Sequence, residues 1–233
     1  MPLAYSAVGA LDRSVSRLRS TRVRASLLQK ITEMDASALE QAKERLRRGE
    51  RAIADLRAAT NFEDAESAWT DFLQSVSAVY AKLEQGSKLS GKSGGWYGRK
   101  KKERKSDPLL SYLHAARNSN EHGIIRVVKR FEDTGPIFGR QPKFGERVPI
   151  TFQSVDPVTG ELTGDPFSGF YSGSTIKLVR VNNTRFNHVC DPPQTHLGVS
   201  VPFFEEPLDV GELALSYLRA MLAEATCLLV SDP

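Results

Sequence analysis

The residues with the clearest chemical potential are Arg117, Asn118 and His122, which fall within six consecutive positions of the chain. An imidazole accepts or donates a proton near neutral pH, and a guanidinium binds a phosphate through two parallel hydrogen bonds. RNA can cleave itself when its 2′-hydroxyl attacks the adjacent phosphate. His122 could then act as general acid or base, while Arg117 stabilises the developing charge. Asn118 lies four residues before His122 and could orient the ring or the phosphate.

A helix over 108–122 is expected to carry these residues. Asp107 is suited to cap its first turn, and Pro108 to begin it, because the N–H that proline lacks has no partner there. Gly123 can end the helix in a left-handed conformation. Apolar residues recur at helical spacing and predict one buried face: Leu109, Tyr112, Leu113 and Ala116.

Arg117 and Asn120 fall on or beside this buried face, where a guanidinium is costly unless it is paired or faces a wet cleft. Arg117 and His122 are about 140° apart on a helical wheel. The reach of the arginine, a frayed last turn or a twofold partner must therefore bring them together. The structural alternative is an Arg117–Glu121 ion pair, with His122 interacting favourably with the helix dipole. We treat His114, Asn120 and Glu121 as accessory candidates.

Two further helices are predicted ahead of this one. Apolar residues at steps of three and four indicate a helix over 39–60, and Asn61 with Asp64 resembles the N-terminal cap of a second. The second helix carries an apolar stripe at the same steps: Phe62, Ala65, Trp69, Phe72, Val76, Val79 and Leu83. A very short turn between the two predicts an antiparallel hairpin. Asp209 is expected to cap a last helix that packs back on this bundle.

Residues 86–106 interrupt the helical pattern with a Gly- and Ser-rich composition that is typical of a flexible loop. Trp96 and Tyr97 lie in this loop and could stack on bases. The cations that follow them could bind phosphates. Together with the two aromatic residues, the predicted RNA-binding residues are therefore Arg99, Lys100, Lys101, Lys102, Arg104 and Lys105. The alternative is a solvated run of charges.

The helical spacing of apolar residues ends at Gly123, and residues 124–207 are predicted to be β-rich. The strand candidates form a small antiparallel sheet: 124–128, 148–153, 175–181 and 185–189. Turns are expected at 156–160 and 164–166. His188, Cys190 and His196, with Asp191, include possible zinc ligands, but their spacing matches no common zinc pattern. Packing at strand ends is the preferred interpretation.

The composition limits the classes of protein to consider. A chain of 233 residues with two cysteines has no disulfide framework, and no segment resembles a secretory signal or a membrane span. A cytoplasmic protein without membrane contact is expected. Residues 1–133 carry 25 Lys and Arg against 17 Asp and Glu, whereas residues 134–233 carry 7 against 11. This asymmetry favours a polyanion partner for the first part, with a salt-bridged helical surface as the alternative.

Arg117, Asn118 and His122, late in a helix of a hairpin bundle, resemble the signature of the HEPN superfamily: Arg, an adjacent polar residue, and His four to six positions on. The resemblance covers residues 38–122 and extends to 209–230, but not to the β-rich part. It implies a homodimer and a metal-independent endoribonuclease of a toxin or defence system, without a cofactor. An antitoxin or regulatory protein would be a further partner. Other members imply a non-catalytic module that binds RNA, a nucleotide or a protein.

The sequence therefore predicts an α+β protein, a HEPN-like helical bundle with a small antiparallel β-rich insertion before the last helix. Residues 1–37 form an N-terminal arm, with a docked helix or a disordered tail as alternatives. Residues 38–123 are expected to form the bundle with its loop at 86–106. Residues 124–207 are expected to form the β-rich part, and residues 208–230 the final helix. A third hypothesis is a scaffold whose β-rich part carries the specificity.

Overall fold

The computed structural model describes residues 33–122, 126–132, 142–183 and 188–229. It combines a helical body with short antiparallel strand pairs, so the expected α+β class is confirmed. Within the described residues, none of the helices is long and apolar enough to cross a membrane. Most of the predicted N-terminal arm, and Gly123 at the predicted end of the motif helix, lie outside the described residues.

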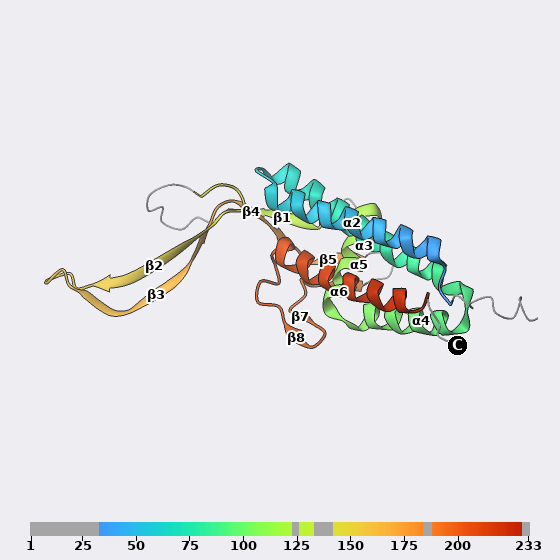
Figure 1. The fold of residues 1–233 in the computed structure, drawn as a ribbon. Helices are drawn as coiled ribbons and strands as arrows, with labels where there is room; N and C mark the ends of the chain where they lie inside the picture. Colours follow the sequence, from blue (N-terminus) through green and yellow to red (C-terminus); the bar gives the residue numbers. More distant parts are fainter. Residues whose placement is uncertain (1–32, 123–125, 133–141, 184–187, 230–233) are drawn as a thin grey trace, which may run out of the picture.

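The predicted helical hairpin is present. Helix α2 (Ala36–Ala58) and helix α3 (Phe62–Gly86) run antiparallel, and α6 (Pro207–Cys227) lies alongside them (Figure 1). The approach of α6 is close at Gly211, where an added Cβ atom would overlap Cδ1 of Ile53. Any larger residue here would require the Ile53 side chain to move. The last helix therefore packs back on the bundle, as the sequence predicted.

Side-chain caps fix where the helices begin. An Asp35 carboxylate oxygen accepts from the N–H of Ala38 at 2.8 Å, and the Asn61 side chain accepts from the N–H of Asp64 at 2.9 Å. Each satisfies one backbone donor that has no partner inside the helix. Helix α6 departs from expectation, because it begins at Pro207. Asp209, the predicted cap, lies within its first turn.

The prediction of a flexible loop at 86–106 is wrong. A short 3₁₀ turn η1 (Ser87–Leu89) leads into helix α4 (Gly91–Ser106), and α5 (Pro108–His122) follows directly after Asp107. Ser93 is fully buried, and its hydroxyl donates to the carbonyl of Ser87 at 2.8 Å. This contact between η1 and α4 helps to offset the low helix propensity of the glycines in this segment.

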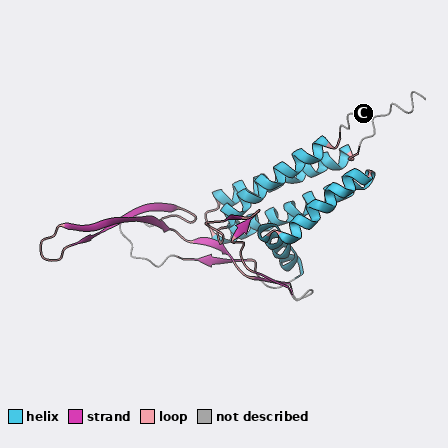
Figure 2. Cartoon of the chain, turned by 90° about the horizontal axis from the view of Figure 1, so that it is seen from below, coloured by secondary structure: helices cyan, strands magenta, loops and turns pink. Residues whose placement is uncertain are grey.

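The β-rich part is not one small sheet but four separate antiparallel pairs (Figure 2). Their strands are β1 (Val128–Phe131) with β4 (Thr175–Leu178), β2 (Arg147–Val155) with β3 (Leu162–Ser172), β5 (Val181–Asn183) with β6 (His188–Cys190), and β7 (Thr195–His196) with β8 (Val199–Ser200). The candidate strand at 175–181 is divided between β4 and β5. The candidate at 185–189 is described only from His188 onward.

The two predicted turns have different outcomes. At the first, an Asp156 side-chain oxygen accepts from the N–H of Val158 at 2.7 Å, and Gly160 adopts φ 74°. The second prediction is wrong, because residues 164–166 lie inside β3. They fall where the β2–β3 register shifts, and the Gln153 side chain donates to the carbonyl of Gly164 at 2.9 Å. The Gly-Asp-Pro sequence therefore forms an irregularity in a strand.

Candidate functional site

The motif residues occupy the C-terminal half of α5, where Arg117 and Asn118 are half-buried. The Arg117 guanidinium donates to the side-chain oxygen of Asn118 at 3.1 Å. The Asn118 amide nitrogen lies 3.4 Å from Nε2 of His114, within reach of a hydrogen bond that the ring nitrogen accepts in its Nδ1–H tautomer. We call His114, Asn118 and Arg117 the polar string. It joins two predicted catalytic residues to one predicted accessory residue.

The imidazole in the polar string is uncharged at neutral pH. Desolvation of the ring, with the nearby positive charges of Arg104 and Arg117, lowers the pKa of His114 to about 4, although part of the residue remains exposed to solvent. Nε2 therefore keeps its lone pair and can accept the amide proton of Asn118. Such a perturbed histidine beside two guanidiniums is a candidate feature of a functional site.

Arg104 of α4 lines the same small hollow as His114 and Arg117 of the polar string. Its guanidinium lies over the ring of Tyr80, with Cζ 4.6 Å from the ring centroid. The hollow is lined by Tyr80, Arg104, His114 and Arg117 together with apolar side chains of α3 and α5, and its volume is about 10 Å³. That is scarcely room for one water molecule. The hollow is therefore too small to enclose an anion of the size of a phosphate.

The remaining motif residues anchor the end of α5. The side chain of Asn120 donates to the hydroxyl of Thr70 on α3 at 3.5 Å, and the hydroxyl of Ser119 donates to the carbonyl of Asn182 at 3.3 Å. Asn120 is thus engaged with α3 rather than with the polar string. The side chains of Glu121 and His122 lie outside the described residues, so the alternative ion pair and the role of His122 stay predictions.

The prediction that Trp96 and Tyr97 stack on RNA bases is wrong for this structure. Each residue is only 5% exposed. The indole N–H of Trp96 donates to a carboxylate oxygen of Glu224 at 2.9 Å, and the Tyr97 hydroxyl donates to the carbonyl of Tyr80 at 3.2 Å. Both rings hold α4 against the helical body and present no free face to a base.

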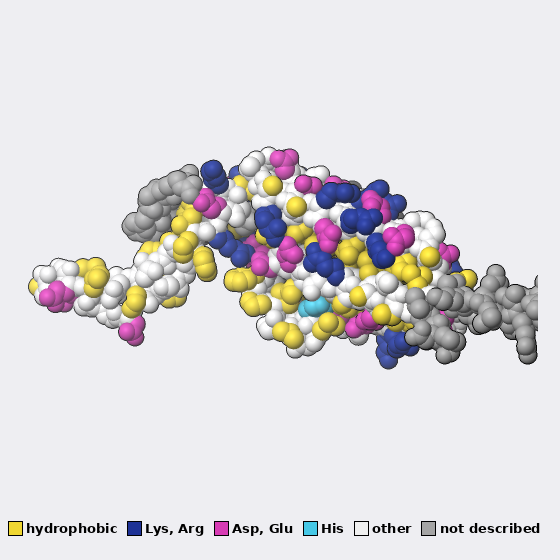
Figure 3. Space-filling view, viewed as in Figure 1, with side chains coloured by type: hydrophobic (Ala, Val, Ile, Leu, Met, Phe, Trp, Pro, Cys, Tyr) yellow, Lys and Arg dark blue, Asp and Glu magenta, His cyan; other side chains and the backbone are white. Residues whose placement is uncertain are grey.

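The cations of α4 from Arg99 onward separate into two groups. Lys100 is largely enclosed and lies 2.9 Å from Glu224 and 3.3 Å from Glu103, while Arg104 faces the hollow. The exposed group, which we call the α4 ridge, keeps its charges in solvent: Arg99, Lys101, Lys102 and Lys105. Lys101 also approaches Glu84 at 3.4 Å. Figure 3 shows Lys and Arg side chains mixed with Asp and Glu on one face of the helical body.

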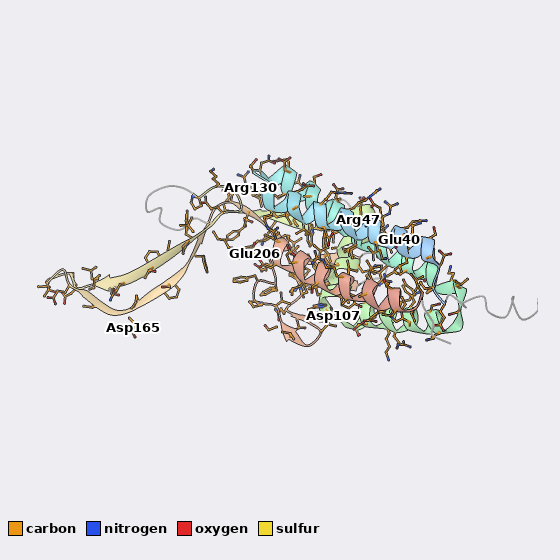
Figure 4. All side chains as sticks on the ribbon, in the orientation of Figure 1. Glu40, Arg47, Asp107, Arg130, Asp165 and Glu206 are labelled. Atoms are coloured by element: carbon orange, nitrogen blue, oxygen red, sulfur yellow. The ribbon has the colours of Figure 1, made fainter. Side chains whose placement is uncertain are left out.

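His196, one of the possible zinc ligands, instead contacts the residue that caps α5. Nδ1 of His196 lies 2.9 Å from Oδ1 of Asp107, whose Oδ2 accepts from the N–H of Leu197 at 2.6 Å. Oδ1 also accepts from the N–H of Leu110 at 2.9 Å, as a cap should. Figure 4 labels Asp107, which lies beside α6 and the β7–β8 pair. Among the described residues, no three His, Cys, Asp or Glu side chains gather to hold a metal ion.

Sequence reasoning missed the pairing of Asp107 with His196. The only signal was the Asp-Pro sequence, and a capping role accounts for it without any contact 89 residues away. Reasoning by spacing also missed the approach of Arg104 to His114, because a loop had been expected where α4 stands.

Comparison with known proteins finds no match to this chain among family models, curated proteins or solved structures. The relationship to the HEPN superfamily therefore stays a prediction from the motif.

Proposed function

We propose that this protein is a HEPN-like, metal-independent endoribonuclease that binds an RNA phosphate beside the polar string. The observation that supports the proposal most is the placement of Arg117. Its guanidinium is half-buried, is oriented by Asn118, and shares the rim of a hollow with Arg104 and an uncharged His114. Two guanidiniums without an acidic residue lining the same hollow favour an anionic ligand.

In this proposal each residue has a separate task. Arg117 and Arg104 bind the scissile phosphate and stabilise the charge that grows as the 2′-oxygen attacks phosphorus. His122 transfers protons, because the reaction needs a base for the 2′-hydroxyl and an acid for the departing 5′-oxygen. Asn118 acts as a positioning residue, since its oxygen accepts from Arg117 and its amide reaches His114. The products carry a 2′,3′-cyclic phosphate and a 5′-hydroxyl.

The α4 ridge would extend the contact along the RNA backbone. Arg104 belongs to the same helix as the ridge, so exposed cations continue from the hollow along α4. Phosphate contacts of this kind add affinity without sequence preference and weaken as salt is raised. The buried Trp96 and Tyr97 contribute to the position of this helix and not to base recognition.

The small size of the hollow favours a second candidate function, a non-catalytic module that binds RNA or a nucleotide. A space of about 10 Å³ encloses no phosphate oxygen. If Arg117 binds a phosphate only at the rim, tight positioning for in-line attack requires groups from outside the described site. A binding module has no such requirement.

The experiment that tests the proposal measures cleavage and binding on the same RNA. End-labelled RNA is incubated in EDTA with the wild type and with Arg117→Ala, His122→Ala and Arg51→Ala, each checked for folding by circular dichroism. Arg51→Ala is the matched control, because this arginine is exposed on α2. We expect wild type and control to cleave, with cyclic-phosphate ends, and the other two to lose activity by about 100-fold or more.

Binding distinguishes the two candidates. RNA that binds without cleavage, with affinity lowered by Arg117→Ala but not by Arg51→Ala, would support the binding module and contradict the nuclease. If the wild type neither cleaves nor binds RNA at low salt, both candidates are wrong.

A further inference from the structure

The paired strands β2 and β3 form an arm, residues 147–172, that projects from the helical body (Figures 1 and 2). A cavity of about 230 Å³ lies where this arm joins the body. Its wall is formed by the end of α2, the beginning of α3, the base of the arm with the residues just before it, β4 and the beginning of α6. Binding sites for small molecules often lie where separate structural units of a protein meet.

The cavity has an apolar part. Leu56, Ala65 and Ile176 belong to the buried core, and Phe144 packs against it. Six of the twelve residues that line the cavity are apolar: Leu56, Ala65, Phe144, Ile176, Pro207 and Leu208. A dry cavity of roughly 150 Å³ is large enough to hold one benzene ring. The space at the base of the arm can therefore accept an aromatic ring together with a short chain.

The charged residues at the cavity are paired unequally. Arg147 donates a hydrogen bond to a carboxylate oxygen of Asp209 at 3.1 Å. Arg57 forms an ion pair with Glu212, which does not line the cavity. Among the described residues, the only ion pair of Glu206 is a longer one of 3.5 Å with the same Arg147. One arginine thus serves two carboxylates, so the cavity carries an excess of one negative charge.

The charge of Glu206 is the least compensated of this group. Its side chain is only 19% exposed. Lys177 lies nearby but forms its ion pair with Glu205, at 3.4 Å. Burial raises the pKa of Glu206 by more than the positive charges of Arg147 and Lys177 lower it. A carboxylate in this environment is stabilised by a further cation that also donates hydrogen bonds.

We propose that this cavity binds a small organic amine, whose ammonium group donates to the Glu206 carboxylate while its apolar part lies against Phe144 and Leu208. The cavity supplies both features of such a site, an apolar space of suitable size and one incompletely paired carboxylate. An aromatic amine fits best, because the Phe144 ring can pack against a second ring.

The same geometry disfavours an anionic ligand. The beginning of a helix generally attracts negative charge, but Glu206 and Asp209 already supply two carboxylates at the beginning of α6. An added anion would face both of them. The inference does not depend on RNA cleavage, because none of the described residues that line the cavity belongs to α5 or to the polar string.

An NMR titration of the full chain with 2-phenylethylamine at neutral pH tests the proposal. The backbone amides of Gly145, Thr175 and Leu208 line the cavity and report where the amine binds. We expect their signals to shift, with a dissociation constant of about 1 mM or lower. The control ligand is 3-phenylpropionate, which has the same ring and chain but a carboxylate in place of the ammonium group. It should bind at least about 10-fold more weakly.

Two neighbouring glutamates provide a matched pair of variants. Glu206→Gln keeps the size of the side chain and removes its charge from the cavity. Glu205→Gln makes the same change at a residue that pairs with Lys177 and does not line the cavity. We expect Glu206→Gln to raise the dissociation constant of the amine at least about 10-fold, and Glu205→Gln to change it by less than about 3-fold. Circular dichroism checks that both variants are folded.

Three results would overturn the proposal. The first is the absence of shifts at the cavity amides up to about 10 mM amine. The second is equal or tighter binding of 3-phenylpropionate, and the third is an equal effect of the two glutamate variants. Shifts confined to residues elsewhere on the surface would show an adventitious additive only, and would contradict the proposed site as well.

Discussion

At the scale of single residues, the chemistry of the site depends on which groups carry charge. His114 stands one helical turn before Asn118 and near two guanidiniums, and its uncharged ring can accept a hydrogen bond from the amide. The oxygen of the same Asn118 side chain accepts a hydrogen bond from Arg117. One asparagine thus couples an imidazole to the guanidinium that we propose to bind phosphate, and a change at any of the three should affect the others.

The pKa of His114 provides the first prediction at this scale. Removing the positive charge of Arg104 should raise this pKa from about 4 toward the ordinary value of 6.5, because a nearby cation disfavours the imidazolium. An NMR titration of the ring protons in Arg104→Gln measures the shift. The control is Arg99→Gln, which changes the same side chain on the exposed side of α4. Equal pKa values in all three proteins would contradict the placement of Arg104.

The same pKa predicts how folding stability depends on pH. The folded pKa lies below the unfolded value, so protons bind more tightly to the unfolded chain. The contribution of His114 is therefore present above about pH 6.5 and is lost as the pH falls toward 4. In His114→Gln the free energy of unfolding, from urea titrations, should fall less between these two pH values. A fall equal to that of the wild type would contradict this assignment.

At the scale of the elements, Asp107 connects α5 to the β7–β8 pair. It caps α5 through Leu110, and it also accepts hydrogen bonds from His196 and from the backbone of Leu197. Leu197 adopts φ 49°, an uncommon conformation for leucine that the surrounding contacts must maintain. The carboxylate is therefore both a helix cap and the anchor of a distant hairpin.

Substituting Asp107 should lower the free energy of unfolding by more than substituting a residue that only caps a helix. Asp107→Ala loses the cap and the contacts of His196 and Leu197, so we expect the free energy of unfolding to fall by about 3 kcal/mol. The matched control is Asp35→Ala, since Asp35 caps α2 through one hydrogen bond and should cost about 1 kcal/mol. Urea denaturation measures both. Equal losses would mean that the contacts to His196 and Leu197 add no stability.

The elements also show what the sequence could predict and why the rest was missed. The helices with a capping side chain and an apolar stripe, α2, α3 and α5, were predicted near their observed limits. Helix α4 was missed because its first half is rich in glycine, and because Trp96 and Tyr97 stabilise it through contacts with distant Glu224 and Tyr80. Local propensity contains no information about such contacts.

At the scale of the whole molecule, the chain separates into a helical body and a projecting arm (Figure 1). The body carries the polar string and the α4 ridge, whereas the arm carries acidic and apolar residues without a cation beyond Arg147. The uneven charge of the sequence therefore corresponds to two different surfaces: the cations that we propose to bind RNA lie on the body, whereas the arm is acidic and apolar.

The proposed binding of the scissile RNA phosphate by Arg117 is tested with the variant Arg117→Lys. Lysine keeps the positive charge but cannot form two parallel hydrogen bonds with a phosphate. The measurement is the rate at which labelled RNA is cleaved in EDTA, with RNA in excess of its dissociation constant. We expect cleavage by the wild type and a rate at least about 100-fold lower for Arg117→Lys, with both proteins folded. An inert wild type, or equal rates for the two proteins, would contradict it.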